Sequence, residues 1–129
     1  MSDFATSVQN AFFTALNVAS VTSLATVLQH VPEDTQPPLV ILSQITLEPF
    51  GGKAGGLDKA IVEIVCLFRG PKRAGLYAIQ AAVRAVIDQQ PISAAGVTLS
   101  VPFHISTDSD QLEDGVTYLG TQRFEVFVQ

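Results

Sequence analysis

The stretch Val31-Pro32-Glu33-Asp34-Thr35-Gln36-Pro37-Pro38-Leu39-Val40-Ile41-Leu42 decides how the first half of this chain folds. Each proline fixes its own φ and pushes the residue before it out of the helical region. Two acidic residues favour contact with solvent, and an apolar run of β-forming residues begins immediately afterwards at Leu39. The stretch is therefore typical of a stiff, solvated turn that leads into a buried strand.

Outward from this stretch, the spacing of apolar residues predicts two helices and five strands. The helices are expected over Asp3–Ala19 and Ala74–Gln89, and the strands over Leu24–Val31, Leu39–Leu47, Asp58–Phe68, Val97–Ile105 and Val116–Val128. A glycine-rich loop, Pro49 to Leu57, separates the second and third strands, and an acidic loop, Thr107 to Gly115, separates the last two.

Periodicity also predicts which side chains are buried. In the second helix the apolar side is expected to be Leu76, Ile79, Val83, Val86 and Ile87, and the wet side Tyr77, Gln80, Arg84 and Asp88. In the strands, the residues expected to share a face are Leu39, Ile41, Ile45 and Leu47 in one, Ala60, Val62, Ile64, Cys66 and Phe68 in another, and Tyr118, Phe124, Val126 and Val128 in the last.

The element order α-β-β-β-α-β-β favours an α+β fold, in which two helices pack against a mainly antiparallel sheet of about five strands. A chain of 129 residues is expected to form a single domain, residues 1–129, with a core large enough to need no disulfide.

Composition narrows the classes of function. The chain is 47% hydrophobic with a mean hydropathy of +0.35, which suggests that neighbouring subunits cover part of its apolar surface. A net charge of -5 argues against a grip on nucleic acid through phosphates. The lone Cys66 allows no internal disulfide and fits a reducing compartment at synthesis. We expect no signal peptide and no membrane span.

Residues that carry chemistry are sparse. His30 and His104 have no partner at a metal-ligand spacing, and Cys66 lies inside an apolar strand, where a thiol is usually a small core residue. The glycine-rich loop lacks the lysine of a phosphate loop, because Leu57 stands at that position. The acidic loop lacks a calcium ligand at Leu112. We therefore expect no catalytic, metal or cofactor site.

Charged residues form two local groups instead. Three of the seven basic residues lie in one turn, at Arg69, Lys72 and Arg73, and four of the twelve acids lie close together, at Asp108, Asp110, Glu113 and Asp114. A head-to-tail ring needs two different, complementary patches on each subunit, and these groups are candidates for them. The glycine-rich loop, with Lys53, is a further candidate for a segment that orders against a neighbour.

Several of these segments together resemble one protein family. The phrase Val31-Pro32-Glu33-Asp34 before Pro38, the helix end Ala82-Val83-Arg84-Ala85-Val86-Ile87 and the closing strand Thr121-Gln122-Arg123-Phe124-Glu125-Val126-Phe127-Val128 are similar to segments of the phage tail-terminator, or tail-completion, family. The resemblance covers roughly residues 25 to 129, in the same order. The family offers no catalytic residues to transfer.

The resemblance implies a structural virion protein, made in the bacterial host cytoplasm and placed at the head-proximal end of the tail. Such proteins form a homohexameric ring that caps the tail tube protein, stops tube growth and meets the head-tail connector proteins, while DNA passes through the hole. An acidic lumen would repel passing DNA. The alternatives are a head-completion or connector adaptor and, from another class, a small oligomeric enzyme or ligand-binding domain.

Overall fold

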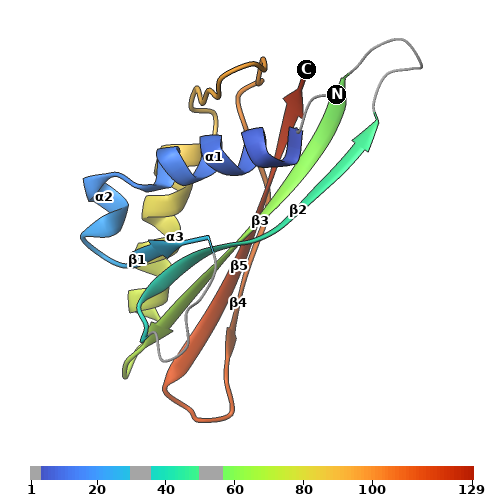
Figure 1. Cartoon of the computed structure of the whole chain (residues 1–129). Coiled ribbons are helices and arrows are strands. Elements are labelled where there is room, and N and C mark those ends of the chain that lie inside the picture. The colour runs from blue at the N-terminus through green and yellow to red at the C-terminus, as the bar shows by residue number, and fades with distance from the viewer. Residues whose placement is uncertain (1–3, 30–35, 50–56) are drawn as a thin grey trace.

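Eight elements follow one another in the computed structural model, which describes residues 4–29, 36–49 and 57–129 (Figure 1). They are α1 (Phe4–Leu16), α2 (Ala19–Thr22), β1 (Thr26–Leu28), β2 (Leu39–Pro49), β3 (Asp58–Arg69), α3 (Ala74–Ile87), β4 (Phe103–Gln111) and β5 (Thr117–Val128). The five strands form one sheet in the order β1-β2-β3-β5-β4. All neighbouring pairs are antiparallel except β1 and β2, so the predicted α+β fold with a mainly antiparallel sheet is confirmed.

The three helices lie on one side of the sheet (Figure 1). From β3 the residues Ala60, Val62, Ile64 and Cys66 are fully buried against them, as the alternation predicts. The helices supply the facing layer of the core, which is Val8, Phe12 and Leu16 from α1, and Leu76, Ile79, Val83 and Ile87 from α3. Each large side chain removed from water contributes roughly 1.5–3 kcal/mol before the entropy of ordering is subtracted, so this layer fixes the helices to the sheet.

The front of the chain differs from the prediction in its boundaries. α1 ends at Leu16, because Val18 adopts an extended conformation with φ -127° and ψ 159°. A second short helix then occupies 19–22, and the amide of Ala25 still bonds to the carbonyl of Val21. The expected strand 24–31 is therefore reduced to Thr26–Leu28 within the described residues. Of the decisive stretch, residues 31–35 lie outside the described part, while Leu39 and Val40 are buried as expected.

In β2, the expectation that the odd-numbered apolar residues share one face is wrong. Val40 and Leu42 join the core, and further along the strand it is Ile45 and Leu47 that pack against it. A bulge between Leu42 and Gln44 inserts one unpaired residue and reverses the alternation from that point on. The periodicity fits each half of β2 separately.

Gln80 of α3 was expected on the wet side of its helix, and that expectation is wrong, because the residue is only 4% exposed. Its side chain lies over Gly120 of β5, where a Cβ atom would stand 2.1 Å from the Gln80 amide nitrogen. The same nitrogen donates a hydrogen bond to the carbonyl of Asp108 at 3.1 Å. A glycine on the facing strand therefore makes room for a polar side chain inside the packed layer.

The expected strand 97–105 is displaced toward the C-terminus, and the acidic loop 107–115 is largely not a loop. β4 spans Phe103–Gln111, so Asp108 and Asp110 are strand residues paired with Thr121 and Leu119 of β5. Of the earlier segment, Leu99 makes an isolated bridge to Val128. The segment 103–111 is polar from Ser106 onward, so its second half carries no apolar alternation, and its pairing with β5 determines how far the strand extends. The shared face of Tyr118, Phe124, Val126 and Val128 on β5 is confirmed.

We predict that Gly75→Ala destabilises the fold. A Cβ at Gly75 would stand 2.1 Å from the ring of Phe68, and overpacking of this kind costs about 1–3 kcal/mol. That exceeds the gain of about 1 kcal/mol from replacing a helical glycine. Urea unfolding measures the change, and the same substitution beside Phe68→Leu is the control, because a smaller side chain there relieves the overlap. A more stable Gly75→Ala single variant would contradict this packing.

Candidate functional site

The residues with reactive side chains are engaged in the fold. Cys66 is buried between β2 and β5, and desolvation raises the pKa of its thiol from 9.0 to about 12, so the thiol is protonated at neutral pH. The ring of His104 packs edge-on against Phe124, with 5.6 Å between centroids, and one ring nitrogen bonds to the hydroxyl of Thr107. His30 lies outside the described residues. Among the described residues, Cys66 and His104 are therefore not hydrogen-bonded to one another as a nucleophile and its base.

The glycine-rich loop, including Lys53, also lies outside the described residues. Within the part of the chain that the structure describes, no three histidine, cysteine or carboxylate groups are placed to hold a metal ion. In the same part, no helix is both long and apolar enough to cross a bilayer.

The basic turn and the acidic residues adjoin at one end of the sheet. Arg69 ends β3 and its guanidinium donates to the hydroxyl of Thr117, the first residue of β5, at 3.2 Å. The amide of Gly70 donates to the carbonyl of Val116 at 2.9 Å. Residues 112–116 form the turn between β4 and β5, so Glu113 and Asp114 stand beside the basic turn. The two charged groups therefore make one mixed surface rather than two separate ones.

Asp114 holds its own turn together. Its carboxylate accepts hydrogen bonds from the amides of Val116 and Thr117 at 3.0 and 2.8 Å, and another from the hydroxyl of Thr117. These bonds, the Thr117 hydroxyl first, lower the pKa of Asp114. Its charge is already partnered within the subunit.

Arg73 and Tyr77 extend the charged end onto α3. The Arg73 guanidinium lies 5.4 Å from the centre of the Tyr118 ring, a cation–π contact. The Tyr77 hydroxyl lies 3.4 Å from that of Ser109 on β4, and this hydrogen bond, followed by one with Arg73, lowers the pKa of Tyr77. Lys72 is exposed in the turn.

The face of the sheet away from the helices carries a ladder of ion pairs. Lys59 lies 3.7 Å from both Glu48 and Glu125, and Arg123 lies 3.0 Å from Glu63 and 3.9 Å from Asp108. These pairs are partly exposed, and such pairs contribute only about 0–1 kcal/mol each. The half-buried apolar residues Ile61, Val65 and Leu67 share this face of β3 with the charges. The face is mixed in character, and its ladder holds four carboxylates against two cations, so acidic charge is in excess there.

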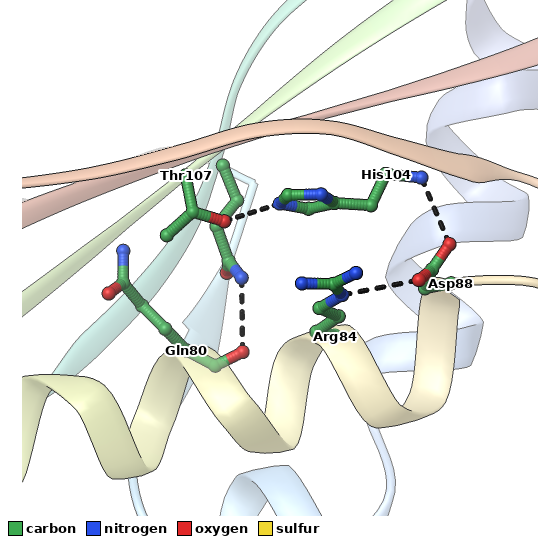
Figure 2. A network of polar contacts seen from close by, with 6 residues as sticks. Gln80, Arg84, Asp88, His104 and Thr107 are labelled. Carbon is green, nitrogen blue, oxygen red and sulfur yellow. Dashed lines mark hydrogen bonds and ion pairs between the residues drawn. The ribbon is translucent and has the colours of Figure 1, made fainter.

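A polar network joins α3 to β4 along a small groove (Figure 2). The carboxylate of Asp88 accepts the backbone amide of His104 at 2.9 Å and the guanidinium of Arg84 at 3.2 Å. The amide nitrogen of Gln122 donates to the backbone carbonyl of Gln80 at 3.1 Å. The groove measures about 280 Å³ and is lined by Tyr77, Gln80, Ala81, Arg84, Thr107 and Gln122.

The side-chain oxygens of Gln80 and Gln122 are buried without a hydrogen-bond partner within the described residues. Sequence reasoning missed this pair, although Gln122 stands on the inward parity of β5 among apolar residues. The sequence did contain a signal for it, because Gln122 is a polar residue at a position where the alternation along β5 predicts a buried side chain. The network fixes the outer strand β4 to the helix layer, which determines the shape of that flank of the molecule.

Comparison with known proteins gives one family and one closely similar fold. The model of the family described as "Tail completion protein gp17" matches residues 10–129. A solved chain from the structure titled "Virion of native gene transfer agent (GTA) particle" superposes with a TM-score of 0.88 at 17% identity, covering 99% of this chain and 98% of that chain. At this identity the likeness establishes a shared fold. No curated protein matches the chain.

We predict that Cys66 resists alkylation in the folded chain. Its side chain is fully buried and its pKa is about 12, so both access and the thiolate form are suppressed. Iodoacetamide labelling followed by mass spectrometry should be slow in buffer and fast in urea. Rapid labelling of the folded chain, with no unlabelled remainder, would contradict the packing of β3.

We predict that Asp114 contributes to stability at neutral pH and ceases to do so in acid. Its pKa is lowered in the fold from 3.8, so its contribution is present above 3.8 and is lost as the pH falls through the folded-state pKa. Thermal unfolding over an acid pH series should show a shallower dependence for Asp114→Asn than for the wild type. Thr117→Val, which removes the hydroxyl that donates to this carboxylate, is the matched variant and should make the dependence shallower in the same direction.

Proposed function

The chain belongs to the tail completion protein gp17 family, and from this membership we propose that it is a structural protein that forms a homohexameric ring on the end of a phage-type tail tube. The family match over residues 10–129 is the observation that carries the proposal. The ring blocks further addition of tube subunits and presents the surface that the head-tail connector proteins join. DNA passes through the ring without specific binding.

This function is binding rather than turnover. The thiol of Cys66 is buried and protonated, and the ring of His104 packs inside the α3–β4 network. A net charge of -5 is suited to a channel that nucleic acid must pass without sticking, since like charges repel. We propose that the chain works as a non-enzymatic component of a virion, at the head-proximal end of the tail, after synthesis in the host cytoplasm.

The shared fold with a chain of a gene transfer agent virion supports this placement, because that particle is itself a phage-like assembly. The partners proposed for the chain are further copies of itself, the tail tube protein and the connector proteins. We propose that eight charged residues make contacts between subunits. They are Lys53, Arg69, Lys72, Arg73, Asp108, Asp110, Glu113 and Asp114. Arg69, Lys72, Arg73, Glu113 and Asp114 lie at one end of the sheet, and Asp110 and Asp108 lie further along β4. Lys53 lies outside the described residues.

Deleting the gene tests the function. We predict that particles lacking the protein have overlong tubes without heads, because nothing stops tube growth or offers a joining surface. Electron microscopy gives the tube lengths, and adding back the purified wild-type chain is the control that should restore normal length and joining.

Two other results would contradict the proposal. Tubes of normal length that lack only heads would assign the chain to the head side, as a completion or connector adaptor. Particles with normal tails and heads would show that the chain is not needed for this step of assembly. An enzyme or a ligand-binding protein should leave tube length unchanged.

A further inference from the structure

Among the described residues, five of the eight large apolar side chains that remain exposed lie next to α2 or in and just before β4, at the two outer flanks of the sheet. The eight are Val18, Leu24, Tyr77, Val101, Phe103, Ile105, Leu112 and Val116. We name Val101, Phe103 and Ile105 the β4 patch, and Val18 and Leu24 the α2 patch. In the β4 patch, Phe103 and Ile105 are about half exposed, at 49% and 48%. Side chains of this size are usually covered when they cluster, so both patches need an explanation.

The two patches stand at opposite ends of the strand order. β4 is the last strand on one side, and β1, which follows directly after α2, is the last strand on the other. Figure 1 shows α2 and β1 on one flank of the molecule and β4 on the other. A subunit of a closed head-to-tail ring presents two different surfaces on opposite flanks, one to each neighbour.

The α2 patch lies in a surface without charge. Residues 4–29 contain no lysine, arginine, aspartate or glutamate, although α1 and α2 have exposed positions such as Asn10, Thr14 and Ser20. A helix that faces water usually carries charged residues on its outer side. The fully buried centre of a protein interface is instead depleted of charge. Burying this flank against a neighbour therefore costs less desolvation free energy than burying the charged end of the sheet.

On the other flank, the backbone of β4 is poorly suited to adding a strand. A register shift between His104 and Ser106 leaves Ile105 as a bulge, which interrupts the ladder and turns the edge. The side chain of Gln80 donates to the backbone carbonyl of Asp108. The carboxylate of Asp88 accepts the backbone amide of His104 (Figure 2). A neighbour would therefore contact this flank through apolar side chains rather than through backbone hydrogen bonds to β4.

We propose that the β4 patch of one copy packs on the α2 patch of a second copy, and that repetition of this contact closes the ring. The inference rests on the proposed function and adds the surfaces through which the subunits meet. A second copy is the occupant because each chain carries both patches, and a head-to-tail contact covers both at once. A single foreign partner would leave one of them exposed.

The test uses two variants of the whole chain. One carries Phe103→Asp and Ile105→Asp, and the other carries Val18→Asp and Leu24→Asp. The substituted side chains are all exposed, so both variants should fold, which circular dichroism and thermal unfolding verify. The matched control is Ser93→Asp with Ala95→Asp, which changes two exposed residues in the turn between α3 and β4, outside both patches and outside the charged end.

Assembly is measured by analytical ultracentrifugation of the wild type, alone and with purified tail tubes, and the condition that gives rings is used for the variants. Each patch variant should lose the ring, and the turn control should keep it. An equimolar mixture of the two patch variants should form dimers and nothing larger. Each variant keeps the patch that its partner lacks, so one contact forms and growth stops.

Rings formed by both patch variants, or a mixture that stays monomeric, would overturn the inference while leaving the proposed function intact. A mixture that assembles beyond dimers would also overturn it. Failure of the proposed function looks different, because the wild type would then neither self-associate nor bind tail tubes.

Discussion

The rest of the structure depends on the alternation of side chains along β3. This strand pairs with β5 along its whole length and with β2 from Asp58 to Leu67, and every second residue from Ala60 to Cys66 is buried under the helices. A slip of one residue in either pairing would turn those apolar side chains to solvent and bring Glu63 inward, so the register is strongly specified. The helix layer, the ion-pair ladder on the other face and the position of both flanks all follow from it.

The sequence predicted burial correctly where a single hydrophobic periodicity holds along a whole helix or strand. It failed where burial depends on a contact with residues far away in the sequence. The buried faces of β3, β5 and most of α3 followed from their own residues. The bulge in β2 did not, since it is visible only against the register of β3. β4 is polar from Ser106 onward, so only its pairing with β5 reveals its extent. The burial of Gln80 depends on a glycine forty residues away, at Gly120. The basic turn and the acidic residues were predicted as two complementary patches; the fold places Glu113 and Asp114 beside the basic turn, and the role of these residues between subunits stays a prediction.

The chemistry of the chain agrees with its architecture. Its thiol is sealed in the sheet, its described histidine is packed in the α3–β4 network, and its exposed features are surfaces: a self-paired charge ladder, a mixed charged end and two apolar flanks. Surfaces of this kind serve assembly, because they bind by shape and burial rather than by activating a group. Membership of a tail completion family agrees with the proposal that these surfaces serve assembly, and the proposed head-to-tail ring requires a subunit with two different flanks.

Cryo-electron microscopy of tail-tube ends carrying this protein tests the central claim most directly. The account predicts one closed layer of six copies at the end of each tube, with the β4 flank of every copy against the α2 flank of the next. Density for a single copy, density along the sides of the tube, or bare tube ends in the presence of excess protein would contradict it.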